Sequence, residues 1–288
     1  MQADKLHARG IYGSGVKWGI VDSGYIEHPD LLKLPQTQIV TVEFPDPTDN
    51  NGHGTHARGI VEMQVNDAGF IGIAPKGIPH IAKGLGGDGS GSPYFIAKCI
   101  DILVEKGCKV INLSLGSDSD SPELTKAINN AFDNGCLCVC AAGNSGGKVI
   151  HPARLSKAVA VAAVDGNKVV ADFSCKGKEI DVAAPGVGIL STWIDGEYRP
   201  ATGTSMAAPH VTGILVLFCE MFNNEHKRFP TPQEMIDYLH ANAQDLGIEG
   251  IDTESGYGLA LAIDINGQEQ KPLTEKCTLL NLLKRIFS

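Results

Sequence analysis

Short apolar runs alternate with segments of helical periodicity along most of the chain. The runs, each closed by Gly, Asn or Asp, occupy residues 15–24, 110–117, 136–144 and 158–164. The helical patterns occupy residues 53–63, 94–106, 122–134 and 205–222. Short apolar strands separated by helices are typical of a parallel sheet covered on both faces. The pattern therefore predicts an α/β fold, a three-layer sandwich with helices on both faces of a mostly parallel central sheet.

Polar residues follow these runs or open these helical patterns. Asp22, Asn144 and residues 114–116 each come directly after an apolar strand segment, and His53 and Ser205 each open a helix. In parallel α/β sheets the functional groups collect at the carboxyl ends of the strands. We therefore expect these five groups, which are far apart in sequence, to converge at one edge of the sheet.

The expected group contains the parts of an acyl-transfer site. A serine hydroxyl is a weak nucleophile at neutral pH and needs a neighbouring base, usually an imidazole whose tautomer a third group fixes. Ser205, His53 and Asp22 can supply these parts. Asn144 offers an amide N–H₂ to an oxyanion, and the backbone N–H of Ser205 lies at a helix start, where the partial charge is positive.

Each of these residues also has a simpler interpretation. Ser205 alone is typical of a helix N-cap, and Asn144 and Asp22 alone are typical of turns. His53 and His56 are three residues apart, which is open to a surface pair or to metal ligands. The stretch HGTH nevertheless lacks the glutamate and the spacing of the zinc motif H-E-x-x-H, and the chain has no C-x-x-C pair.

Four blocks of the chain resemble the signature blocks of the subtilisin-like serine proteases, in that family's order of Asp, His, Asn and Ser. The blocks are VDSG at 21–24, NGHGTHARGIV at 51–61, AAGNSG at 141–146 and GTSMAAPHVTG at 203–213. The resemblance extends from about residue 3 to about residue 265. It implies that Ser205 attacks the scissile carbonyl, that His53 is general base and then acid, that Asp22 orients His53, and that Asn144 stabilises the oxyanion. No cofactor is implied for catalysis.

The resemblance also implies where a peptide or protein substrate binds. An extended segment adds as a strand, so that main-chain hydrogen bonds hold it and pockets read alternate side chains. The residues implied in this binding are Ser114, Leu115, Gly116, Gly86, Gly87 and Ile150. Ile150 stands where many relatives have glycine at the base of the specificity pocket. This replacement predicts a shallow pocket and a preference for small or medium apolar residues before the scissile bond.

A structural calcium site is a second implication, and the sequence supports it only in part. Asp30 and Asn66, with carbonyls around Ala68 and Phe70, match part of the family's calcium loop. Calcium takes six to eight oxygen ligands, and the N-terminal arm that helps hold the ion in many relatives is missing from this sequence. The resemblance therefore leaves calcium binding open.

Composition excludes some functions and indicates a compartment. The formal net charge of −9 disfavours a nucleic-acid binder, which needs clustered Lys and Arg. We find no window that approaches the about 20 apolar residues of a membrane span. The eight cysteines include three that alternate on one strand, which suits buried free thiols in a reducing compartment. With no apolar leader at residues 1–10, the expected location is cytoplasmic, or secreted if a leader has been removed.

The chain divides into two expected parts. Residues 1–266 form the catalytic domain, and residues 267–288 form a polar linker and a short amphipathic helix. Such a helix either packs on its own domain or docks on a partner or membrane surface. The chain starts about 20 residues before Asp22, whereas the usual extracellular members carry a long pro-segment. It either has been processed or folds without one.

These patterns predict a serine endopeptidase, with an intracellular role in processing or degradation. The alternative is a non-catalytic peptide-binding relative, but such relatives normally lack a member of the triad, and none is lost here. An esterase with a G-x-S-x-G elbow does not fit, because GTSMA lacks the second glycine.

Overall fold

A parallel sheet forms the centre of the molecule in the computed structural model, which describes residues 1–66 and 69–265. Within these residues the sheet has seven strands, in the order β2 (Ile39–Thr41), β3 (Ile78–Lys83), β1 (Lys17–Asp22), β4 (Val110–Leu113), β5 (Leu137–Ala141), β6 (Ala158–Val164) and β7 (Ile180–Pro185). All neighbouring strands in it pair in parallel. A separate antiparallel hairpin consists of β8 (Ile189–Thr192) and β9 (Tyr198–Ala201).

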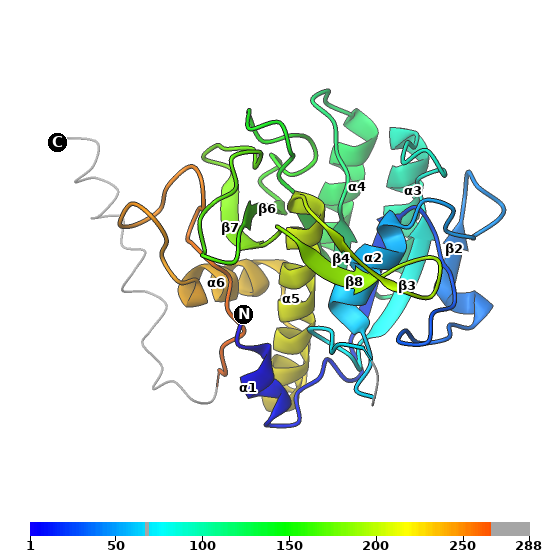
Figure 1. The fold of residues 1–288 in the computed structure, drawn as a ribbon, viewed down its shortest axis with the longest axis horizontal. Helices are drawn as coiled ribbons and strands as arrows, with labels where there is room; N and C mark the ends of the chain where they lie inside the picture. The colour runs from blue at the N-terminus through cyan, green and yellow to red at the C-terminus, as the bar shows by residue number, and fades with distance from the viewer. Residues whose placement is uncertain (67–68, 266–288) are drawn as a thin grey trace.

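Helices cover both faces of the sheet, as the sequence predicts. They are α1 (Ala3–His7), α2 (His53–Glu62), α3 (Pro93–Glu105), α4 (Pro122–Asp133), α5 (Thr204–His226) and α6 (Pro232–Asn242), with a 3₁₀ turn η1 (Gln36–Gln38). One core cluster packs α2, α5 and α6 against one face, and a second packs α3 and α4 against the other. Figure 1 shows α5 in the middle of the molecule with α2 beside it. The three-layer α/β sandwich is therefore confirmed.

Alternation along the strands explains why both faces are apolar. In β5 the side chains of Leu137, Val139 and Ala141 join the core around α5, while Cys138 and Cys140 join the core around α3 and α4. Successive side chains of a strand point to opposite faces, so a strand covered on both sides must be apolar at every position.

Helix α5 is the central core helix. The sequence analysis found no window suited to a membrane span, but by length and composition α5 could cross a membrane. Its apolar stretch is almost entirely buried inside the fold. A helix that is apolar all round and surrounded by protein is typical of the centre of a large domain. Its burial here accounts for its composition without a membrane.

Cysteine side chains contribute to the core as small apolar groups. All seven described cysteines are buried and unpaired. Burial raises the pKa of Cys99, Cys108, Cys138 and Cys219 to about 12, so these thiols are not ionised at neutral pH. This fits the expectation of buried free thiols, whereas Cys277 and the predicted C-terminal helix lie outside the described residues.

Candidate active site

Asp22 and His53 meet at the carboxyl edge of the sheet. Asp22 is the last residue of β1 and His53 is the first residue of α2. Asp22 is fully buried, and the His53 side chain is 28% exposed. His53 Nδ1 donates a hydrogen bond to Asp22 Oδ1 at 2.8 Å and approaches Oδ2 at 3.0 Å. The carboxylate of Asp22 raises the pKa of His53, while burial acts in the opposite direction. With Nδ1 held as a donor, Nε2 is the nitrogen that can take up a proton.

The turn before α2 requires a glycine and packs on the hairpin. Gly52 has a left-handed φ of 97°, and a Cβ there would lie 2.6 Å from the indole of Trp193. His56, one turn further on, places Nε2 at 2.9 Å from the carbonyl oxygen of Ile189 and 3.0 Å from that of Arg199. Burial lowers the pKa of His56. Its contacts therefore join α2 to the hairpin as a structural link.

Ser205 lies at the start of α5, beside the end of β4. Its hydroxyl is half-buried and donates to the carbonyl oxygen of Ser114 at 3.3 Å, and Ser114 Oγ donates to the carbonyl oxygen of Ser205 at 2.7 Å. Within the described part of the chain, the Ser205 hydroxyl makes no hydrogen bond to His53. Catalytic hydrogen bonds are often long in ligand-free enzymes and tighten when substrate binds. At 3.3 Å, the hydrogen bond from the Ser205 hydroxyl to Ser114 is weak, so replacing it by a bond to His53 costs little.

Asn144 has its amide fixed by the residue that precedes Ser205. The backbone N–H and the hydroxyl of Thr204 both donate to Asn144 Oδ1, at 2.8 Å and 2.9 Å. The Thr204 hydroxyl in turn accepts from the backbone N–H of Gly143 at 3.1 Å. Because the carbonyl side of the Asn144 amide accepts both bonds, its N–H₂ side is left to donate, and it donates to no other group in the described residues. The Asn144 side chain is exposed, so this donor can reach a ligand.

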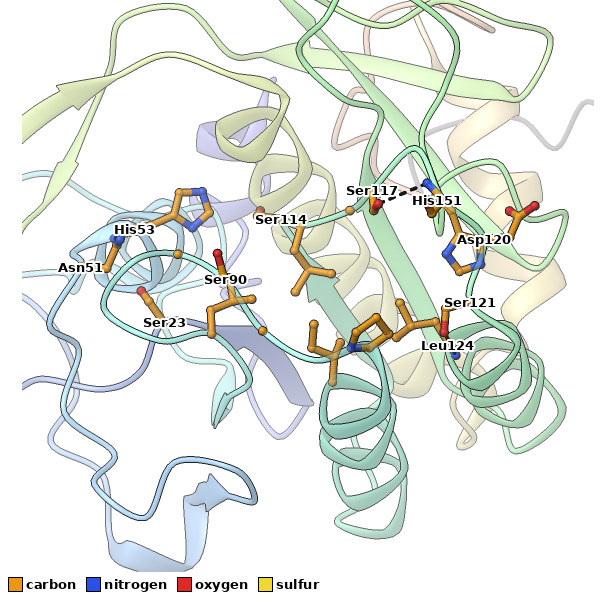
Figure 2. Close-up of a pocket in the computed structure, with 18 residues that line it drawn as sticks. Ser23, Asn51, His53, Ser90, Ser114, Ser117, Asp120, Ser121, Leu124 and His151 are labelled. Atoms are coloured by element: carbon orange, nitrogen blue, oxygen red, sulfur yellow. Dashed lines mark hydrogen bonds between the residues drawn. The ribbon is translucent and has the colours of Figure 1, made fainter.

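A cavity of about 460 Å³ opens beside His53. Figure 2 shows His53 at one end, Ser114 in the middle, and Asp120, Ser121 and His151 at the other end. The apolar part of its wall comes from Leu85, Pro93, Ile96, Leu115 and Leu124. Of the residues predicted to bind substrate, Ser114, Leu115 and Gly116 line this cavity. Gly86 and Gly87 do not, whereas Gly89, Ser90 and Gly91 of the same loop do.

Ile150 lies between the two chain segments that follow β4 and β5. A Cβ on Gly116 would lie 2.6 Å from Ile150 Cδ1, and a Cβ on Gly143 would lie 3.0 Å from Ile150 Cγ2. The isoleucine side chain therefore fills the space between Gly116 and Gly143. Gly116 follows Ser114, whose carbonyl accepts from the Ser205 hydroxyl, and Gly143 precedes Asn144. It is not part of the 460 Å³ cavity wall.

The predicted calcium ligands form a hydrogen-bonded cluster. Asp30 is buried, and its Oδ1 accepts from Asn66 Nδ2 at 2.8 Å. Its Oδ2 accepts from the Tyr198 hydroxyl at 3.1 Å and from the backbone N–H of Phe70 at 3.3 Å. A calcium ion needs oxygen ligands directed at it, whereas both Asp30 oxygens here face N–H or O–H donors. The described side chains therefore direct no unoccupied carboxylate oxygen at an ion, and Ala68, whose carbonyl the sequence analysis also counted, lies outside the described residues. Over the described ranges no group of three or more His, Cys, Asp or Glu side chains could hold a metal ion.

Three polar residues that the sequence analysis did not single out support these side chains. Thr204 fixes the Asn144 amide, and Ser23 and Asp49 hold the start of α2. Asp49 carried a readable signal, since an acidic residue shortly before a helix start is typical of a cap. No local sequence signal indicates the role of Thr204, because that role depends on Asn144, 60 residues away in the chain.

Comparison with known proteins identifies similar chains. The profile of the Subtilase family matches residues 13–258. Subtilisin Savinase of Lederbergia lenta is 44% identical over 218 residues, which cover 75% of this chain and 81% of that protein. Subtilisin DY of Bacillus licheniformis is 40% identical over 255 residues, which cover 86% and 90%. The Major intracellular serine protease of Bacillus subtilis is 40% identical over 234 residues, which cover 75% and 72%.

Some relatives are considerably longer than the matched region. M-protease of Shouchella clausii is 44% identical over 218 residues, which cover 75% of this chain and 57% of that protein. The chain therefore spans little more than half the length of this relative.

Proposed function

This chain belongs to the subtilase family, and on that premise we propose that it is a serine endopeptidase that cleaves extended polypeptide segments through Ser205, His53 and Asp22. The observation that carries the proposal is the convergence at one sheet edge. His53, hydrogen-bonded to Asp22, lines the same cavity as Ser114, which exchanges hydrogen bonds with Ser205 at the start of α5. The amide of Asn144 is held by Thr204, the residue before Ser205. The relatives named as proteases support the same class of reaction.

The proposed reaction uses these groups in two steps. Ser205 Oγ attacks the scissile carbonyl carbon while His53 Nε2 takes the hydroxyl proton, and Asp22 stabilises the imidazolium that forms. The Asn144 N–H₂ donates to the oxyanion. His53 then protonates the leaving amine, the C–N bond breaks and an acyl-enzyme remains. Water, deprotonated by His53, attacks this ester, and its breakdown returns the proton to Ser205 Oγ.

Labelling by a fluorophosphonate tests the proposal directly. The reagent phosphonylates only a serine that an adjacent base activates. We expect the native chain to gain one adduct, which peptide mapping assigns to Ser205, and the heat-denatured chain to gain none. Absence of an adduct from a folded chain would contradict the proposed activity.

One observation favours a second candidate, a non-catalytic peptide-binding relative. The Ser205 hydroxyl donates to the Ser114 carbonyl and not to His53. A binding protein would hold an extended peptide at residues 114–116 without cleaving it. The labelling result separates the two candidates, and incubation with casein, followed by mapping of the cut sites, shows whether cleavage is broad or restricted.

We propose that the substrate has a small or medium apolar residue before the scissile bond, since Ile150 occupies the space between Gly116 and Gly143. Replacing Ile150 by Gly should reopen this space. We expect the ratio of kcat/KM for Phe over Ala at that substrate position to rise by about 10- to 100-fold, the range that differences of a few apolar atoms produce. Peptide-library profiling measures it, with Ile248→Gly on an exposed loop as the control. A wild-type preference for Phe or Tyr would contradict the assignment.

We do not propose a calcium ion at Asp30, because both of its carboxylate oxygens accept hydrogen bonds from described donors. The melting temperature should therefore be the same in EDTA as in calcium. Replacing Tyr198 by Phe removes the 3.1 Å bond to Asp30 and should lower the free energy of unfolding by about 1 kcal/mol. Thermal unfolding measures both, with Tyr94→Phe, an exposed tyrosine, as the control. A fall in melting temperature on chelation would show that the ion is required after all.

We also propose a domain boundary and a cellular location. Residues 1–266 would form the catalytic domain, which agrees with the family match to residues 13–258. Seven buried, unpaired thiols support a reducing, intracellular compartment. The relatives include both an intracellular serine protease and subtilisins. Docking of a partner through residues 267–288 remains a proposal, and those residues lie outside the described structure.

A further inference from the structure

The buried carboxylate of Asp49 accepts five hydrogen bonds. It lies before α2 and is only 2% exposed. Its Oδ1 accepts from Ser23 Oγ at 2.9 Å and from the backbone N–H groups of Gly52 at 2.8 Å and Asn51 at 3.0 Å. Its Oδ2 accepts from the Thr55 backbone N–H at 2.9 Å and from the Thr55 hydroxyl at 2.6 Å. Burial is the largest single effect and would raise the pKa of Asp49, but the hydrogen bonds together outweigh it, so the pKa is lowered.

These contacts make Asp49 the cap of α2. The residue in the N-cap position is Gly52, which has no side chain to cap the helix. Asp49 takes over this role from three residues upstream, and its negative charge lies at the positive end of the helix dipole. His53 is the first residue of the helix, and its backbone N–H donates to Asn51 Oδ1 at 3.2 Å. Asp49 therefore fixes the backbone on both sides of His53.

Ser23 extends the same network to the end of β1. Its hydroxyl donates to Asp49 and accepts from the backbone N–H of Gly54 at 2.9 Å. Its own backbone N–H donates to Asp22 Oδ1 at 2.7 Å. The strand end that carries Asp22 and the helix start that carries His53 are thus joined through two buried side chains, Ser23 and Asp49.

We propose that Asp49 is a positioning residue for the proton transfer. It holds the backbone on both sides of His53, which sets the imidazole relative to Asp22, and it places a second negative charge at the start of α2. Asp49 does not touch the reacting atoms. Among the described residues, Asp22 from β1 and Asp49 from this loop raise the pKa of the imidazole, and His53 in turn lowers the pKa of His56, one turn along α2. The inference rests on the proposed function, because it needs His53 to act as the base.

Two variants separate the charge of Asp49 from its mechanical link. In Asp49→Asn the carboxylate charge is lost. The amide N–H₂ also replaces one acceptor oxygen, so either the two Thr55 donors or the Ser23 and Gly52 donors lose their acceptor. In Ser23→Ala the charge stays while the link to Gly54 is lost. We expect Asp49→Asn to lower kcat per active site by about 10- to 100-fold, in line with the cost of small misplacements, with KM within about twofold. The acid limb of its pH–rate profile should move to lower pH.

Ser23→Ala should lower kcat by about 10-fold and leave the acid limb in place. Fluorophosphonate titration of the full chain counts the competent sites, so a variant that merely folds poorly loses sites and keeps its kcat per site. Asp46→Asn, an exposed carboxylate on the same loop, is the control and should change neither quantity.

The outcomes distinguish this inference from the proposed function. If the wild-type chain is not titrated by the fluorophosphonate, the proposed function fails and the inference fails with it. If the wild type is titrated and Asp49→Asn keeps the wild-type kcat per site and the wild-type acid limb, only the inference is overturned. Should Asp49→Asn not fold, an unchanged kcat per site in Ser23→Ala overturns the positioning role.

Discussion

Replacement of Ser205 by Ala should lower kcat by roughly a million-fold, or about 8 kcal/mol of transition-state stabilisation. The variant has no oxygen to form the acyl-enzyme, so His53 and Asp22 have no nucleophile to activate. A residual rate above that in water should remain, because the Asn144 amide still binds the oxyanion. The loss is measured by monitoring, over hours, the product formed when the variant hydrolyses a peptide amide substrate.

The fold should survive this change. Among the residues that the structure describes, the Ser205 side chain hydrogen-bonds only to Ser114, at 3.3 Å. The stronger 2.7 Å bond at this point uses the Ser205 carbonyl, which alanine retains. The melting temperature should therefore stay close to that of the wild type. Ser156→Ala, an exposed serine, is the matched control and should keep full activity. Substantial turnover by purified Ser205→Ala would show that another group is the nucleophile.

The sequence was sufficient to predict the parallel sheet and the edge where polar groups meet. The apolar runs that became β1, β4, β5 and β6 are buried on both faces, so their composition alone distinguishes them from loops. Strand β3 gave a weaker signal because Pro79, His80 and Lys83 interrupt its apolar character. Its place between β1 and β2 depends on pairing with both neighbours, which no local pattern encodes.

The site was predictable at the level of residue types, and less so at the level of contacts. Asp22 and His53 end a strand and begin a helix, and the rule for parallel sheets was enough to bring them together. The two donors of Thr204 to Asn144 depend on a packing contact between distant segments. Likewise, Tyr198 reaches Asp30 from the hairpin, 168 residues along the chain. A partial match to a calcium loop could not reveal that hydroxyl.

Replacement of Asp22 by Asn should lower kcat by about 10⁴-fold. In the wild type, His53 Nδ1 donates to the Asp22 carboxylate, which leaves Nε2 unprotonated and able to act as a base. The amide of an asparagine can donate to Nδ1 instead, and the proton then sits on Nε2, where it blocks the reaction with Ser205. The loss should therefore appear in kcat while substrate binding is retained.

The pH dependence gives this prediction a second, independent readout. Asp22 is the largest influence that raises the pKa of His53 above its ordinary 6.5. The imidazole is the active base only above its own pKa, so the wild-type acid limb should lie above pH 6.5 and should move to lower pH in Asp22→Asn. Because a raised folded-state pKa favours the folded chain most at low pH, the variant should lose more stability at pH 5 than at pH 9. Rate profiles and thermal unfolding measure these effects, with Asp133→Asn on the surface as the control. An acid limb that stays in place would mean that Asp22 does not set the protonation of His53.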